Sequence, residues 1–188
     1  MWHQHDCIIL DACCVLTLYA SGRMTEILES VPVQTMLSRY VLEEEALYTY
    51  SGPDGDERSA KEPVGLTPLR NQGLIEVSSL SGEAEIRSFV DLASRLDDGE
   101  ARTIAMAINR NWGVATDEKK ASRILREVAP KIQIITTPDL VKHWADSERI
   151  SDAEVAVVLR SVHKRGVYRP GRSHPLSGWW DSYFSASP

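Results

Sequence analysis

Acidic side chains recur where the sequence changes from one predicted element to the next. Asp11 directly follows residues 7–10, an apolar run typical of a buried parallel strand. Asp117 and Glu118 directly follow residues 112–116, a second predicted strand. The carboxyl ends of parallel strands meet at one edge of the sheet, where ligands bind in open α/β folds. We therefore expect these acids to lie close together.

Two further groups of acids belong to the same set. Glu100 falls in the first turn of a predicted helix whose N-cap we place at Asp98. Glu43, Glu44 and Glu45 are consecutive in another predicted helix, and an exposed helix face would account for two of the three. Each acid alone could be a helix cap or an exposed residue on a helix surface. The expected convergence of all of them on one sheet edge is what points to chemistry.

Clustered carboxylates repel one another, and a hard divalent cation is the usual remedy. Mg²⁺ and Mn²⁺ prefer oxygen ligands and keep several waters, which leaves room for substrate phosphates. A cation held in this way can generate a nucleophilic hydroxide and neutralise the charge that builds up on a phosphate during hydrolysis. Metal-dependent phosphodiester hydrolysis is therefore the chemistry that we assign to these acids.

The elements that must position the acids alternate as in a parallel α/β fold. Strands are predicted at residues 7–10, 33–36, 74–77, 112–116 and 132–135. Helices are predicted at 12–30 with a break near 21–22, 39–47, 68–71, 83–96, after Asp98, after 118, 137–144 and 151–164. This pattern predicts an α/β class with a central parallel sheet and helices on both faces. Residues 51–63, rich in Gly, Pro and charge, predict a loop.

The predicted helix at 83–96 has one apolar face. Its apolar periodicity predicts that Ile86, Phe89, Val90 and Ala93 face inward. In the helix after Asp98, an apolar stripe at i, i+3, i+4 and i+7 is expected to lie against the sheet. Near the C-terminus, Trp179, Trp180, Tyr183 and Phe184 would either fold back onto their own domain or stack on bases or a partner.

Size and composition are those of one globular domain. The chain has 188 residues, of which 43% are hydrophobic and 26% charged. We expect a domain at 1–150 and a C-terminal helix and aromatic tail at 151–188. No apolar run approaches the length of a membrane span, and residues 1–6 lack the basic start and apolar run of a signal peptide, so we expect a cytoplasmic protein without a membrane partner. The chain lacks the phosphate-binding glycine motifs of nucleotide enzymes and the G-x-S-x-G elbow of hydrolases.

The net charge of −6 argues against blanket attraction to nucleic acid, but the charge is uneven. A basic run of Lys119, Lys120, Arg123 and Arg126 follows the acids at 117–118. Residues 160–174 carry five cationic Lys and Arg side chains and no acid. An acidic pocket flanked by basic patches would suit an enzyme acting on a polyanion. Solvated helix faces are the alternative for either patch alone.

The cysteines Cys7, Cys13 and Cys14 crowd the first predicted strand and helix. An odd number in apolar surroundings favours reduced thiols over a disulfide framework. Adjacent Cys13 and Cys14 could form a metal or redox pair, but the sequence offers no second C-x-x-C and no neighbouring His to support one.

Taken together, the motifs resemble the PIN-domain family, and most closely its bacterial and archaeal branch of VapC-like toxins. The resemblance covers roughly residues 7–144. The matching pieces are Ile8-Ile9-Leu10-Asp11-Ala12, Val41-Leu42-Glu43-Glu44, Gly99-Glu100-Ala101 with Ile104 and Ala107, and Val114-Ala115-Thr116-Asp117-Glu118-Lys119. Each motif alone is weak, but their order and spacing together are fairly specific.

The resemblance implies a three-layer α/β/α sandwich with an acidic pocket that binds Mg²⁺ or Mn²⁺ and cleaves single-stranded RNA, here with a C-terminal helical extension. Carried over, the metal-binding catalytic acids are Asp11, Glu44, Glu100 and Asp117, with Thr116 beside the last of them. Glu44 is chosen because Val41-x-x-Glu44 matches the family spacing; Glu43 is the fallback and Glu118 an auxiliary acid. Lys119, Lys120 and Arg123 would hold the RNA. An antitoxin protein and a homodimer are the implied protein partners.

Two departures from the family pattern leave an alternative open. Cys13 stands where many relatives carry Ser or another small polar residue, and a thiol is the poorer partner for a hydrated Mg²⁺. The third acid, Glu100, is Glu in place of the commoner Asp. Cys13 and the acidic net charge favour a second hypothesis, a PIN-fold module that binds nucleic acid or protein without hydrolysis. A DNA-directed nuclease with the same site is the third.

Overall fold

The structure, a computed structural model, describes residues 5–50 and 60–185 of the chain. In chain order, its elements are β1 (Cys7–Leu10), α1 (Ala12–Ala20), α2 (Met24–Ser30), β2 (Gln34–Ser38), the π-helix η1 (Val41–Glu45), β3 (Tyr48–Tyr50), β4 (Lys61–Pro63), α3 (Thr67–Asn71), β5 (Glu76–Ser78), α4 (Gly82–Ala93), α5 (Asp98–Arg110), β6 (Gly113–Ala115), α6 (Lys119–Val128), β7 (Ile134–Ile135), α7 (Thr137–Ser147), α8 (Asp152–Arg165) and α9 (Ser177–Ser185).

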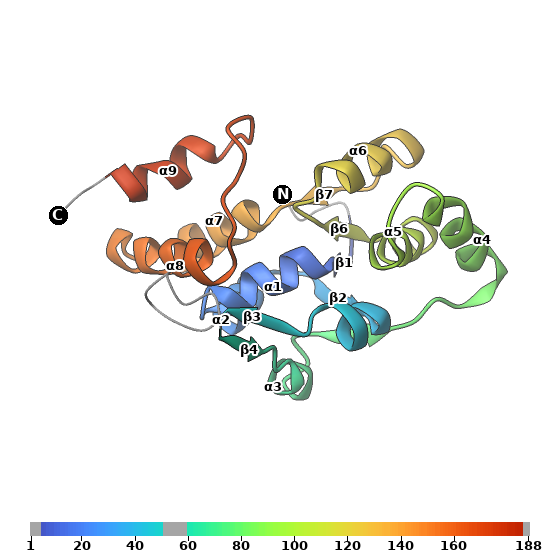
Figure 1. The fold of residues 1–188 in the computed structure, drawn as a ribbon, viewed down its shortest axis with the longest axis horizontal. Helices are drawn as coiled ribbons and strands as arrows, with labels where there is room; N and C mark the ends of the chain where they lie inside the picture. The colour runs from blue at the N-terminus through green and yellow to red at the C-terminus, as the bar shows by residue number, and fades with distance from the viewer. Residues whose placement is uncertain (1–4, 51–59, 186–188) are drawn as a thin grey trace. The chain divides into compact units, whose positions relative to one another are not determined.

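Five strands form one sheet in the order β5-β2-β1-β6-β7, and every neighbouring pair in it is parallel (Figure 1). This central parallel sheet flanked by helices confirms the predicted α/β/α fold class. The chain runs outward from β1 through β2 to β5, then returns to the other side of β1 with β6. The strand order therefore reverses between β1 and β6, and such a reversal opens a crevice at the carboxyl ends of the two strands.

The chain divides into two compact units that interleave along the sequence. The first comprises residues 1–15, 32–47 and 65–136, and the second residues 16–31, 48–64 and 137–188. The first unit therefore holds the whole parallel sheet together with η1, α4, α5 and α6. The helix α1 contributes its first residues to this unit and the rest to the second.

The core of the first unit lies where α5 packs on the sheet. Helix α5 contacts β1, β2 and β6, and Ile104 and Ala105 of its apolar stripe are buried against Ile9 and Val114. Fully burying a side chain such as Ile9 stabilises a fold by about 1.5–3 kcal/mol. The predicted stripe on this helix is confirmed, and it fixes the start of α5 close to the ends of β1 and β6.

The second unit is built from helices and a hairpin. Strands β3 and β4 pair antiparallel, α2 packs with α7, and α8 packs with β3 and α9. Trp180 of α9 is fully buried, with its ring edge-on to that of Tyr168, so the aromatic tail folds onto its own unit. Of the loop predicted at 51–63, residues 51–59 lie outside the described residues, and Lys61–Pro63 forms β4.

Two details of the sequence prediction are wrong. Helix α4 does not bury Ile86 and Val90, which are 52% and 60% exposed; its buried residues are Glu85 and Leu92. Helix α5 is capped by Asp97, with Asp98 its first residue. Among the described residues, no helix combines the length and the apolar character that crossing a membrane would require.

Candidate metal centre

The ends of β1 and β6 hold the first two predicted site residues side by side. Leu10 pairs with Ala115 at the last register position, so Asp11 and Thr116 leave the sheet opposite each other. The Asp11 backbone N–H donates to the Ala115 carbonyl over 2.9 Å, and the Thr116 hydroxyl donates to Asp11 Oδ2 over 2.9 Å. The Asp11 carboxylate therefore lies at the strand reversal.

Asp11 is only 4% exposed. The Ala12 N–H donates to Oδ1 over 2.9 Å, and the Cys13 thiol donates to Oδ2 over 3.4 Å. Burial is the main cause that raises the pKa of Asp11, although the hydrogen bonds from Thr116 and Cys13 act in the opposite direction. A buried carboxylate with a raised pKa is one that a nearby positive charge would stabilise.

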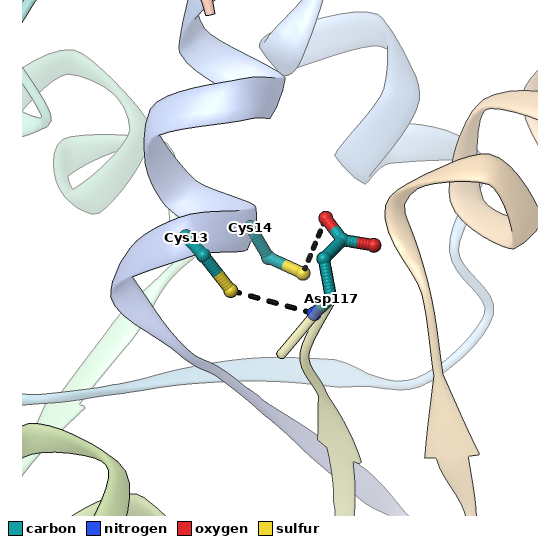
Figure 2. A group of neighbouring side chains, drawn as sticks. All are labelled: Cys13, Cys14 and Asp117. Atoms are coloured by element: carbon teal, nitrogen blue, oxygen red, sulfur yellow. Dashed lines mark hydrogen bonds between the residues drawn. The ribbon is translucent and has the colours of Figure 1, made fainter. Parts of the chain in front are cut away.

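Asp117 lies next to the two adjacent cysteines at the start of α1. Its backbone N–H donates to Cys13 Sγ over 3.4 Å, and the Cys14 thiol donates to Asp117 Oδ2 over 3.6 Å (Figure 2). One ligand atom from each of the three residues lies within 4.8 Å of the other two. Among the residues that the structure describes, these three therefore form a group of side chains that lie close enough together to hold a metal ion.

Glu100 is held at the beginning of α5 by a reciprocal cap. The Glu100 N–H donates to Asp97 Oδ1 over 2.8 Å, and the Asp97 N–H donates to Glu100 Oε2 over 3.3 Å. This pair is a capping box, which satisfies two amide groups at a helix start. Burial, and then repulsion from Asp97, Asp11 and Glu118, raises the pKa of Glu100. The carboxylate of Glu100 is therefore part of the acidic group around Asp11.

The structure places a different glutamate than the predicted Glu44 beside these acids. Glu45, not Glu44, faces this acidic group. The Gly99 N–H donates a hydrogen bond to the Glu45 carboxylate, and burial together with repulsion from Asp97, Asp11 and Glu100 raises the pKa of Glu45 from 4.5 to about 7. The reason is the geometry of η1, in which the Ala46 N–H bonds the Val41 carbonyl five residues back over 2.7 Å.

Glu43 and Glu44 are exposed and line a separate pocket of about 240 Å³ with Arg39, Tyr40 and Arg102. Arg39 forms an exposed ion pair with Glu43, 3.2 Å between Nη1 and Oε1. The structure therefore brings Asp11, Glu45, Asp97 and Glu100 into one electrostatic group, whereas Glu43 and Glu44 are exposed.

The remaining predicted residues lie at the start of α6. Glu118 is exposed and precedes this helix, and its N–H donates to the Thr116 hydroxyl over 3.1 Å. Lys119, Lys120 and Arg123 follow on α6, and all three side chains are exposed. Exposed cations directly after Asp117 are placed where a polyanion approaching the carboxylates could meet them.

The oxygen donors of this group fit a hard divalent cation. Asp11, Glu45 and Glu100 supply carboxylate oxygens, and repulsion and burial destabilise the charged form of all three. A divalent cation relieves both effects, and oxygen is the donor that Mg²⁺ and Mn²⁺ prefer. Asp117, which follows β6, adds a carboxylate next to Cys13 and Cys14. The Cys13–Cys14–Asp117 group supplies softer donors.

Two residues of the centre were missed from sequence, and one of them could have been found. The spacing Asp97-x-x-Glu100 is itself the pattern of a capping box and identifies Asp97. Glu45 could not have been found in this way, because a π-helical turn leaves no distinctive residue pattern among three consecutive glutamates. The partner of Cys14 is likewise 103 residues away in sequence.

Comparison with known families gives one result. A family model for the PIN domain matches residues 7–172. The match therefore spans both strand ends, η1, the start of α5 and most of the helices that follow. Comparisons with curated proteins and with solved structures returned no significant match.

Proposed function

The chain belongs to the PIN-domain family, and from this membership we propose that it is a divalent-metal-dependent endoribonuclease that cleaves single-stranded RNA. We assign the cation to Asp11, Glu45, Glu100 and Asp117, with Mg²⁺ or Mn²⁺ as the ion. A role as the toxin of a toxin–antitoxin pair, with an antitoxin protein as partner, is the setting that the VapC-like motifs favour.

One observation carries the proposal: three carboxylates from separate elements repel one another at the strand reversal of a parallel sheet. Asp11 follows β1, Glu45 ends η1 and Glu100 lies in the first turn of α5. Asp11 and Glu100 both raise the pKa of Glu45, and Asp11 also raises the pKa of Glu100. Such a group destabilises the fold unless it is protonated or meets a counter-charge, and a bound divalent cation would supply that counter-charge.

The protein's own residues have separable tasks in this proposal. A cation at the centre would offset the negative charge that develops on a phosphodiester as it is hydrolysed. Asp11 is oriented by Thr116 Oγ1 and the Ala12 N–H, so its carboxylate enters the reaction in a fixed position. Glu45 is oriented in the same way by the Gly99 N–H.

The exposed cations at the start of α6 would bind the flanking phosphates. Lys119 and Lys120 come two and three positions after Asp117, and Arg123 follows one turn later on the same helix. Contacts to phosphates fix the register of a nucleic acid without reading its sequence. Neutralising these cations should weaken RNA binding and reduce its dependence on salt.

The test is cleavage of a labelled single-stranded RNA with Mg²⁺ or Mn²⁺, with and without EDTA, next to a DNA strand of the same sequence. We expect EDTA-sensitive cleavage of RNA, abolished in Asp11→Asn and Asp117→Asn while circular dichroism shows an intact fold. The matched control is Glu44→Gln, an acid outside the electrostatic group. Cleavage by both Asp variants at the wild-type rate would refute the proposal. Preferential cleavage of the DNA strand would show that the substrate is DNA and not RNA.

A specific contact favours a second candidate, a PIN-fold binding module without hydrolysis. The Cys13 thiol, rather than a hydroxyl, lies 3.4 Å from Asp11 Oδ2 and 3.7 Å from Thr116 Oγ1. Thiols are weak hydrogen-bond partners for a hydrated hard cation. Isothermal calorimetry separates the two candidates: neither heat nor thermal stabilisation at millimolar Mg²⁺ or Mn²⁺ would favour the binding module.

A further inference from the structure

The side chains of Cys13, Cys14 and Asp117 form a second candidate ligand group within the first unit. Both cysteines come from the first turn of α1, whereas Asp117 follows β6. Figure 2 shows the Cys14 thiol directed at the Asp117 carboxylate and the Cys13 thiol directed at the Asp117 backbone nitrogen. Their ligand atoms lie within 4.8 Å of one another. The contacts come from residues more than 100 positions apart in sequence, so the folded sheet and not the local chain creates the group.

The donor set of two sulfurs and one carboxylate oxygen is poorly suited to Mg²⁺. It suits Zn²⁺, which binds Cys sulfur at about 2.3 Å and Asp oxygen at about 2.0–2.2 Å in a tetrahedral arrangement. Ligand atoms around such an ion lie about 3.5–3.8 Å apart, as follows from those bond lengths. The observed separations reach that arrangement with side-chain movements of about 1 Å.

Burial gives this group a closed side and an open side. Cys14 is fully buried, whereas Cys13 and Asp117 are half-buried. An ion could therefore enter from the side of Cys13 and Asp117, and its fourth position would be left for a water. Three protein ligands with one open position is the arrangement found in zinc sites that exchange a ligand.

We propose that Cys13, Cys14 and Asp117 bind a thiophilic divalent cation of the Zn²⁺ class. Each thiol that becomes a ligand releases its proton to solvent, so the bound species are two thiolates and one carboxylate. Binding itself does not depend on the activity of the protein. Its consequence rests on the proposed function: Zn²⁺ would take Asp117 from the hard-cation centre and pull Cys13 away from Asp11, so Zn²⁺ would inhibit RNA cleavage.

The direct test uses Co²⁺ as a spectroscopic substitute for Zn²⁺ with the reduced, full-length protein. We expect one equivalent of Co²⁺ to produce the near-ultraviolet absorption of a thiolate–cobalt bond and Zn²⁺ to abolish it. The absorption should be lost in Cys13→Ser and Cys14→Ala. The matched control is Cys7→Ser, because Cys7 is the third thiol of the chain and lies outside the group; it should bind Co²⁺ as the wild type does.

Three results would overturn the site: no such absorption in the wild type, its persistence in both Cys13→Ser and Cys14→Ala, or its loss in Cys7→Ser. Circular dichroism checks the fold of each variant. If the buried Cys14→Ala protein does not fold, the half-buried Cys13→Ser protein and the wild-type titration still decide.

A second measurement separates this site from the proposed function. Zn²⁺ is titrated into a cleavage reaction that contains excess Mg²⁺, and the Zn²⁺ concentration for half-inhibition should rise about tenfold or more in Cys13→Ser but not in Cys7→Ser. Equal Zn²⁺ sensitivity of Cys13→Ser and the wild type would refute the competition. Cobalt binding without RNA cleavage in any protein would support the site and refute the nuclease.

Discussion

The carboxylate of Glu45 lies against the backbone of Gly99, whose N–H donates a hydrogen bond to it. A Cβ atom added at Gly99 would overlap that carboxylate. The glycine in the Gly99-Glu100-Ala101 motif is therefore required by an acid more than 50 positions earlier in sequence. This contact joins the π-helix η1 to the start of α5 and sets where the second acid of the centre lies.

The choice between neighbouring glutamates can be tested directly. We expect Glu45→Gln to lower metal-dependent cleavage by at least about 10- to 100-fold, because loss of a residue that merely supports a metal ligand already costs that much. Glu44→Gln should remain close to the wild type, because Glu44 is exposed and lies outside the electrostatic group. Initial rates at saturating Mg²⁺ measure both. The reverse pattern would restore Glu44 as the ligand that its spacing from Val41 predicts.

Substitution of Gly99 should disturb the site more than the fold. In Gly99→Ala the new methyl group displaces the Glu45 carboxylate, and overpacking of this kind costs about 1–3 kcal/mol. We expect reduced cleavage and a lower midpoint of thermal unfolding. Gly178→Ala is the matched control, because nothing lies within 4 Å of a Cβ added there. Full activity in Gly99→Ala would mean that Glu45 is not needed at its observed position.

The raised pKa of Glu45 predicts how metal-free stability varies with pH. The pKa is about 7 in the folded state against 4.5 ordinarily, so between these values the folded protein holds a proton that the unfolded chain has released. Stability from this residue is therefore present below pH 4.5 and lost as the pH rises through 7. Thermal unfolding in EDTA should show the wild type losing stability relative to Glu45→Gln from pH 5 to pH 8. A constant difference between the two would contradict the shift.

The ion pair between α4 and α5 should matter for stability and not for chemistry. Arg110 Nε lies 2.6 Å from Glu85 Oε1, and these side chains are 20% and 8% exposed. The hydrogen bonds from Arg110 are also the main cause that lowers the pKa of Glu85. We expect Glu85→Ala to lower the free energy of unfolding by about 2–3 kcal/mol, because it strands the Arg110 charge.

The control for that prediction is Glu83→Ala on the same helix. Glu83 pairs with Arg87, but both side chains are highly exposed, and exposed pairs contribute about 0–1 kcal/mol. Urea unfolding measures both variants. A similar loss in the two proteins would show that burial does not distinguish these ion pairs.

The strands and the strand-end acids were predictable because their pattern is local. Residues 7–10 form a continuous apolar run, and an acid directly after it must lie at the sheet edge whatever the rest of the chain does. The inward face of α4 was not predictable in this way. The bidentate pairing of Glu85 with Arg110, 25 positions away, turns a charged residue inward and leaves Ile86 and Val90 outside, against the apolar pattern.

The candidate site divides along the same line. Asp11, Glu100 and Asp117 stand beside turns that sequence patterns mark, so their placement near the sheet edge could be predicted. Glu44 is predicted from the family spacing Val41-x-x-Glu44, whereas in the structure the π-helix η1 places Glu45 beside the other acids. Asp117, the third member of the group with Cys13 and Cys14, is about 100 positions away in sequence, so the local pattern of cysteines does not predict it.

The capping box at the start of α5 has a consequence for affinity. One oxygen of Glu100 is already tethered to the Asp97 amide, so the side chain has given up most of its rotational freedom before any ion arrives. An exposed glutamate without such a hydrogen bond loses on the order of 1–2 kcal/mol of side-chain conformational entropy when it binds an ion. The cost of ordering this ligand is thus met once, when the polypeptide folds, and does not recur with each binding event.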